Sequence, residues 1–108
     1  MIEIKQRKNG LYYFEVKTPN GQTIFTSNDY ATKAAYLNGI ESVKQNSQDD
    51  TRFDRRFSAT DKPYFNLKAA NGQIIGWSEI YESIAARENG IESVKRVMDG
   101  IINSELRK

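Results

Sequence analysis

A seven-residue segment of this chain occurs twice without change. Residues 38–44 read Asn-Gly-Ile-Glu-Ser-Val-Lys, and residues 89–95 repeat them 51 positions later. At the same offset, 18 of the 43 pairs between residues 2–44 and 53–95 are identical, whereas unrelated pairs match about once in fifteen to twenty. The chain is therefore an internal duplication, with copy one in residues 1–50 and copy two in residues 51–108.

The length of the chain decides how the two copies are organised. A copy of about 50 residues would be only marginally stable by itself, whereas a chain of 108 residues is long enough for one sufficient core. We therefore expect one domain over residues 1–108 in which the two copies share a single core.

Each copy begins with three segments that are typical of β-strands. In copy one, Ile2–Lys5 alternates apolar and polar residues, Leu11–Lys17 is rich in aromatic and β-branched residues, and Gln22–Ser27 follows. Asn-Gly pairs separate these segments and predict tight hairpins, in which Gly21 and its equivalent Gly72 provide the positive φ of a type I′ turn. The strands of copy two are expected at residues 52–55, 63–68 and 73–78.

The comparison of the two copies predicts which side chains face the core. Phe14 and its equivalent Phe65 are apolar in both copies, as are Val16 and Leu67, so this face of the second strand should be buried. On the third strand we expect the inward-facing residues to be Ile24, Thr26, Ile75 and Trp77.

A helix is expected after the third strand of each copy, beginning near Thr32 and Ser83. The apolar residues keep a helical period through Gly39 and Gly90, which favours a continuous helix over a break at Asn-Gly. A glycine inside a helix costs about 1 kcal/mol relative to alanine, so we expect it to let the helix approach the sheet or the other helix. The expected core positions are Ile40, Val43, Ile91 and Val94. The expected solvated positions are Glu41, Lys44, Glu92 and Lys95.

The carboxyl end of copy two has two interpretations. Asp99-Gly100 resembles a helix stop, after which Ile101–Asn103 forms either a short last strand or one more helical turn. We favour the strand, because Arg52–Arg55 occupies the corresponding place after the first helix. If residues 101–106 paired between chains the protein would dimerise, but a monomer is the favoured expectation.

The repeated residues resemble the YegP-like family, small and mostly bacterial proteins of uncharacterised function. The resemblance rests on residues 64–75, Ser78, Tyr81 and residues 89–95, with a weaker copy over residues 13–44. It implies a β₃-α-β unit, used in tandem or as a dimer, whose units build one sheet and exchange their last strands. The family brings no established catalytic or binding residues.

The predicted fold class combines the pattern and the resemblance. We expect an α+β domain of two tandem β-β-β-α(-β) repeats related by a pseudo-two-fold axis. The repeats should form one mostly antiparallel sheet of six or seven strands, with two helices on one face and the last strands exchanged between repeats.

The composition argues against most catalytic chemistry. The chain has no cysteine and no histidine, which removes thiol nucleophiles, the usual general base and the commonest metal ligands. Adjacent carboxylates at Asp49-Asp50, and the pair Glu79 and Glu82, are far more often solvated than catalytic, so an enzyme that uses carboxylates alone is the least favoured reading. We expect no metal site and no cofactor, because neither calcium-loop nor phosphate-loop spacing occurs. Without a signal peptide or a membrane-length apolar run, a cytoplasmic protein is the default expectation.

Binding remains the favoured class of function. We expect a small, non-catalytic binding or accessory protein that acts through protein–protein contact, for example at an edge of its sheet. The alternative is weak binding of single-stranded nucleic acid on the sheet face away from the helices, where bases would stack on rings and phosphates would meet lysines. Ordinary cross-strand pairing is favoured over that alternative, because the net charge is only +2 and Glu15 interrupts the patch. The candidate residues of this face are Tyr13, Lys17, Tyr64, Asn66 and Lys68.

Overall fold

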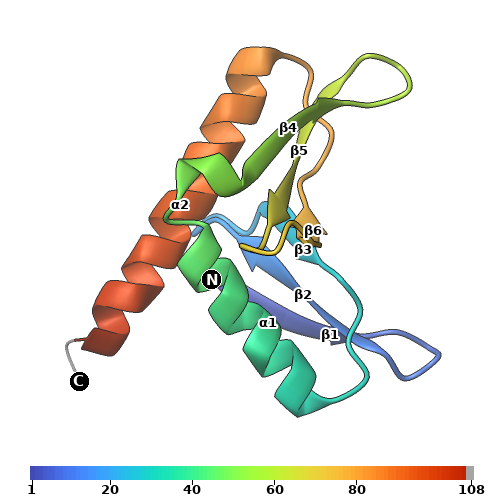
Figure 1. Ribbon diagram of the computed structural model, residues 1–108, viewed down its shortest axis with the longest axis vertical. Helices are drawn as coiled ribbons and strands as arrows, with labels where there is room; N and C mark the ends of the chain where they lie inside the picture. The colour runs from blue at the N-terminus through green and yellow to red at the C-terminus, as the bar shows by residue number, and fades with distance from the viewer. Residues whose placement is uncertain (107–108) are drawn as a thin grey trace.

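The computed structural model describes residues 1–106 and contains six strands and two α-helices (Figure 1). Copy one forms β1 (Ile2–Gln6), β2 (Tyr12–Lys17), β3 (Thr23–Ser27) and α1 (Lys33–Asn46). A short 3₁₀ helix, Asp50–Arg52, leads into copy two. Copy two forms β4 (Phe53–Phe57), β5 (Pro63–Lys68), β6 (Ile74–Trp77) and α2 (Ile84–Leu106).

The six strands form one antiparallel sheet in the order β1-β2-β3-β6-β5-β4. The two copies meet where β3 pairs with β6, and there Thr26 lies opposite Trp77, which is its own equivalent in copy two. A pseudo-two-fold axis therefore passes between these two residues. The same offset relates the other pairings, such as Ile2 with Val16 and Phe53 with Leu67. The predicted α+β fold class is confirmed.

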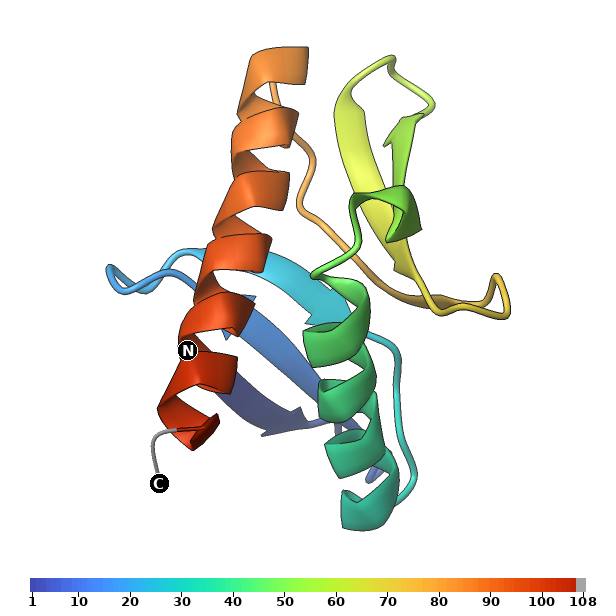
Figure 2. The same ribbon diagram turned by 60° about the vertical axis from the view of Figure 1, so that its left-hand side comes forward.

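Both helices cover one face of the sheet, and the core lies between them and the strands (Figure 2). The core positions predicted on β2 and β5 are fully buried, as are Val43, Ile91 and Val94, and Ile40 packs against the core at its margin. Each helix contacts strands of both copies, so neither copy has a core of its own. The fully buried residues of the second strands are Phe14, Val16, Phe65 and Leu67.

The predicted inner face of the third strands is wrong in part. Phe25, not Thr26, faces the core on β3, because Phe25 pairs across the sheet with the buried Val16. The ring of Phe25 packs over Gly76, its equivalent in copy two, where an added Cβ would overlap the ring and lie 2.6 Å from the Thr26 carbonyl oxygen. One phenylalanine thus fills the space beside the axis that two symmetric side chains would share. Thr26 and Trp77 lie on the opposite face.

The glycines repeated inside the helices make room for a tyrosine. Both helices are continuous through Gly39 and Gly90, as predicted. The close neighbour is not the sheet backbone or the other helix but the ring of Tyr30 or Tyr81, which would overlap an added Cβ. Each tyrosine ring lies parallel to a core phenylalanine, and burial raises the pKa of both phenols.

Two repeated serines join the second and third strands of each copy. The Ser27 hydroxyl accepts a hydrogen bond from the Phe14 amide and donates to the Asn28 carbonyl. In copy two, Ser78 makes the equivalent bonds to Phe65 and Glu79. These identities between the copies therefore serve the fold.

The carboxyl end of copy two differs from the prediction. Ile101–Asn103 continues α2, which runs to Leu106, so residues 1–106 contain no seventh strand and no strand exchange. The helix continues because Met98 is fully buried and Ile101 packs against the core. β4 is the first strand of copy two, paired with β5.

The repeated lysines are also less solvated than predicted. Lys44 Nζ contacts Glu41 (2.6 Å) and Glu105 (2.7 Å), and its side chain is only 6% exposed. Burial lowers its pKa, but hydrogen bonds to both carboxylates outweigh this and raise the pKa overall. Lys95 pairs with Asp50 at 2.8 Å. Lys44 therefore ties α1 to the extended end of α2.

The hairpin turns are not type I′. Gly21 and Gly72 have φ of +87° and +86°, as predicted, but the asparagines before them do not have positive φ. In each turn the glycine amide donates to the carbonyl three residues earlier, at Thr18 or Ala69. This bond and the left-handed glycine are those of a longer loop with a bulge. At the β4–β5 turn, Asp61 takes this role with φ of +60°.

The Tyr81 contact predicts that two glycines of α2 respond oppositely to alanine. Gly90→Ala should lower stability by about 1–3 kcal/mol, because the new Cβ overlaps a ring that is held against Phe65. Gly100→Ala should raise it by up to about 1 kcal/mol, because nothing lies within 4 Å of an added Cβ and alanine favours the helix. Urea denaturation measures both changes, and a Gly90→Ala variant as stable as Gly100→Ala would contradict the close packing.

Candidate functional site

The five residues of the predicted binding face share the sheet face away from the helices, called here the open face. β2 contributes Tyr13 and Lys17, and β5 contributes Tyr64, Asn66 and Lys68. They alternate with the buried core residues along each strand. The structure therefore brings these side chains to one surface. Four of them are half-buried and Asn66 is buried.

The cations of the open face are paired with carboxylates on neighbouring strands. Lys17 lies 2.6 Å from Glu3, and Lys5 lies 3.0 Å from Glu15. The hydrogen bond from Lys17 lowers the pKa of Glu3, and the bond with Glu15 raises the pKa of Lys5. On the other half of the sheet, Asp54 accepts ion pairs from Arg56 (2.8 Å) and Lys68 (3.5 Å).

The central row of the open face is acidic rather than basic. Cross-strand register places Glu3, Glu15, Thr26, Trp77, Asn66 and Asp54 in one line across the sheet. Trp77, 39% exposed, sits in the middle of this line. Phosphates need unpaired cations beside the stacking rings, and on this face the lysines already have carboxylate partners. The charges of the open face therefore form ordinary cross-strand pairs rather than a phosphate-binding surface.

Three of the four carboxylates considered for catalysis have structural partners. Asp49 accepts a hydrogen bond from the Thr51 amide and caps the 3₁₀ helix. Asp50 pairs with Lys95 and Arg55, which lower its pKa. Glu82 pairs with Lys62. Within residues 1–106, no three acidic side chains gather where they would hold a metal ion.

The two outer edges of the sheet are formed by equivalent strands, β1 and β4. Along β1, the Lys17 amide donates to the Met1 carbonyl and the Arg7 amide donates to the Leu11 carbonyl, both at 2.8 Å. Successive residues of an antiparallel strand point their backbone groups to opposite sides. The backbone groups of Ile2, Ile4 and Gln6 therefore point away from β2, and no described strand pairs with them. This row is called here the β1 edge.

A network of charges covers the corresponding edge at β4. Arg55 Nε lies 2.9 Å from Glu88 on α2, and its Nη2 lies 3.2 Å from Asp50. The Arg87 guanidinium lies over the Phe57 ring at 5.3 Å and donates to the Arg56 carbonyl. Paired charges at an edge strand discourage the addition of another strand.

The β1 edge carries apolar side chains at the same places. The offset of 51 relates Ile4 to Arg55 and Leu37 to Glu88. Because Arg55 and Glu88 form an ion pair, the pseudo-two-fold relation assigns Ile4 and Leu37 to the corresponding places at the β1 edge. Ile4 is 40% exposed and Leu37 is 47% exposed. On the helix side, the β4 edge thus carries an ion pair where the β1 edge carries two partly exposed apolar residues.

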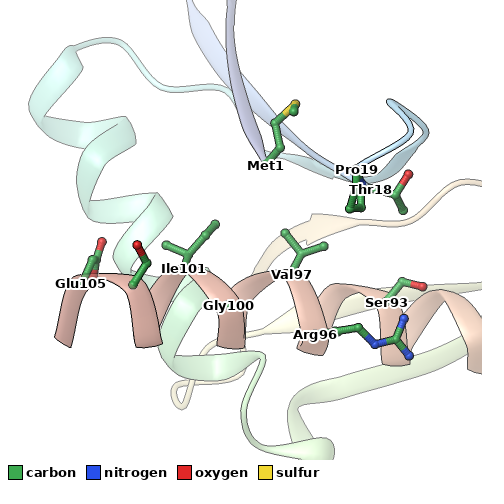
Figure 3. Close-up of a pocket in the computed structure, with 10 residues that line it drawn as sticks. Met1, Thr18, Pro19, Ser93, Arg96, Val97, Gly100, Ile101 and Glu105 are labelled. Atoms are coloured by element: carbon green, nitrogen blue, oxygen red, sulfur yellow. The ribbon is translucent and has the colours of Figure 1, made fainter. Parts of the chain in front are cut away.

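A groove of ≈ 620 Å³ lies near the start of β1, between α2 and the β2–β3 turn (Figure 3). Its apolar lining includes Met1, Pro19, Val97 and Ile101. The groove is specific to this half of the molecule, because α1 ends at Asn46 and has no equivalent of the last helical turns of α2, which contain Ile101. It offers apolar contact next to the β1 edge rather than a set of reactive groups.

The sequence patterns alone do not single out Ile4 and Leu37. The signal was present, because two exposed positions change from an ion pair in copy two to two apolar residues in copy one. Its meaning depended on the fold, in which these two positions are equivalent to the ion-paired Arg55 and Glu88. No helix within residues 1–106 is long and apolar enough to span a bilayer.

Comparison with known proteins gives a consistent result. A family model described as "Domain of unknown function (DUF1508)" matches residues 8–54 and again residues 58–100, one match in each copy. A UPF0339 protein of Acinetobacter baylyi is 55% identical over 93 residues, covering 86% of this chain and 84% of that protein. The solution NMR structure of the protein of unknown function yegP from E. coli has a TM-score of 0.85 at 41% identity, covering 90% and 84% of the two chains. That of a UPF0339 protein from Shewanella oneidensis has a TM-score of 0.82 at 48% identity, covering 88% and 80%.

The paired charges predict that the open face does not hold single-stranded nucleic acid. In an amide NMR titration with short single-stranded RNA or DNA, Tyr13, Tyr64 and their neighbours should not shift, even at low salt where phosphate contacts are strongest. An Asp54→Asn variant, which releases Lys68 and Arg56, provides the control with unpaired cations. Salt-sensitive shifts confined to the open face of the unmodified protein would contradict this expectation.

Proposed function

Because this chain belongs to the DUF1508 (UPF0339, YegP-like) family, a domain family of unknown function, we propose its function from its own geometry. The protein is a non-catalytic binding protein. It takes up an extended segment of another protein at the β1 edge. Strand addition of this kind obtains affinity from main-chain hydrogen bonds and specificity from alternate side chains.

The contrast between the two sheet edges is the observation that carries this proposal. β1 and β4 are equivalent strands of the two copies, so the fold requires the same of each. Copy two covers its edge with the Arg55–Glu88 ion pair. Copy one has Ile4 and Leu37 at these positions, both partly exposed. An exposed apolar edge is a liability for a protein that binds nothing, because it favours pairing with other chains.

The β1 edge defines the chemistry of the partner segment. Its backbone would pair with Ile2, Ile4 and Gln6, whose amides and carbonyls point outward. On the helix side, alternate apolar side chains of the segment would cover Ile4 and Leu37. On the open face, the intervening residues would meet Glu3 and Lys5. The fitting partner is therefore an extended segment with an apolar residue at every second position.

A transfer of the ion pair between edges tests the proposal. The probe is a capped peptide of about seven residues in which valine alternates with threonine, long enough to cover the five residues of β1. In an amide NMR titration it should shift β1 and Leu37 but not β4. The double variant Ile4→Arg/Leu37→Glu should bind at least about tenfold more weakly, because the edge is then covered as in copy two.

The reverse variant is the matched control. Arg55→Ile/Glu88→Leu removes the ion pair from β4 and should add a second peptide site there. Circular dichroism of both variants checks that the fold is retained. The proposal fails if Ile4→Arg/Leu37→Glu retains its fold and binds the peptide as tightly as the unmodified protein.

A further inference from the structure

We propose that the β1 edge is self-complementary and that a second copy of this chain pairs with it through its own β1. The two chains would join antiparallel about a two-fold axis through Ile4, extending the sheet across both molecules. This inference concerns the same edge as the proposed function but rests on the sequence pattern of β1 itself. The occupant of the edge is in this case an identical strand.

The backbone of β1 has the geometry for such a pair. With Ile4 opposite Ile4 of the second copy, Ile2 faces Gln6 and Gln6 faces Ile2. These are the residues whose backbone groups point away from β2. Each of the three opposed pairs then exchanges two hydrogen bonds, so about six bonds form across the axis. The register is thus compatible with a hydrogen-bonded pair at the axis.

The charges of β1 are complementary in the same register. Glu3 of one chain lies opposite Lys5 of the second copy, and Lys5 lies opposite Glu3. Both residues are on the open face, where they already pair with Lys17 and Glu15 of their own chain. Non-hydrogen-bonded positions bring opposed side chains close together, so the added charges extend the two ion-pair ladders across the axis. A register shifted by two residues loses both of these pairings.

The apolar side chains of the edge lie on the helix side of the same pair. Ile4 meets its own copy at the axis, and Leu37 on α1 is the exposed apolar residue that takes the place of Glu88 on this side of the sheet. Ile4 is 40% exposed and Leu37 is 47% exposed, and pairing would remove part of this apolar surface from water. The pattern required of a partner strand, acidic then apolar then basic, is the pattern of Glu3-Ile4-Lys5 itself.

The equivalent strand of copy two does not have this property. In β4 the central residue is Arg55, so a symmetric pair would place two guanidinium groups at the axis. Arg55 is also held by Glu88 and Asp50. Self-pairing is therefore confined to one edge, which gives a closed dimer rather than a fibre. The interface is small, so the dimer is weak and the protein is monomeric when dilute.

The first arm of the test measures molar mass against concentration by sedimentation equilibrium, up to about 1 mM, where interfaces this small associate. The unmodified protein should show reversible dimer formation. Ile4→Arg should weaken association at least about tenfold, because two like charges then meet at the axis. The matched control is Ile80→Arg, the same change at a residue 54% exposed outside the sheet, and it should associate like the unmodified protein.

The second arm tests the symmetry of the pair. Ile4→Arg and Ile4→Glu should each be monomeric, and an equimolar mixture of the two should form a dimer, because opposite charges then meet at the axis. Dimers that form equally well in Ile4→Arg, or a mixture that does not associate, would overturn the proposal. A strictly monomeric unmodified protein that still binds the valine–threonine peptide would overturn this inference and leave the proposed function intact. Dimer formation without peptide binding would overturn the proposed function and leave this inference intact.

Discussion

The ring of Phe25 fills the space beside Gly76, and the joining of the two repeats depends on this contact. The strands β3 and β6 pair at the axis of the duplication, so a residue and its equivalent approach each other there. Two phenylalanines would not fit in this space and two glycines would leave a cavity. One of each fills it, as the close packing of protein interiors requires. The repeats have therefore diverged into complementary halves of one core.

The remaining identities and differences between the copies separate fold from function. The repeated serine, tyrosine and helix glycine of each copy form one packed unit that binds the third strand, the core phenylalanine and the helix together. Positions outside this unit were free to change. At the sheet edges they changed in a coordinated manner, from two apolar residues in copy one to an ion pair in copy two. This coordination is why we propose that the β1 edge binds a partner.

The sequence predicted the parts of the fold that recur in both copies. The strands, the continuous helices and the buried Phe14 and Phe65 follow from patterns present twice. The errors concern features that depend on tertiary contacts. Ile101 stays helical because it packs on the core beyond a helix stop signal, and Thr26 faces outward because Phe25 takes the core position. For the candidate site, alternation along β2 and β5 placed the open-face residues correctly. It did not reveal that Glu3, Glu15 and Asp54 pair with their cations, because those partners lie on neighbouring strands.

The central claim is that the two repeats fold as one unit because they are complementary at β3 and β6. Trp77, the single tryptophan, lies on this junction and reports on it by fluorescence, whereas far-ultraviolet circular dichroism reports on the helices. The decisive measurement is urea unfolding of the unmodified protein and of Gly76→Ala, followed by both signals. We predict that the two signals coincide in each protein and that Gly76→Ala shifts both midpoints together to lower urea. Separate transitions in the unmodified protein, or an unchanged midpoint in Gly76→Ala, would contradict the claim.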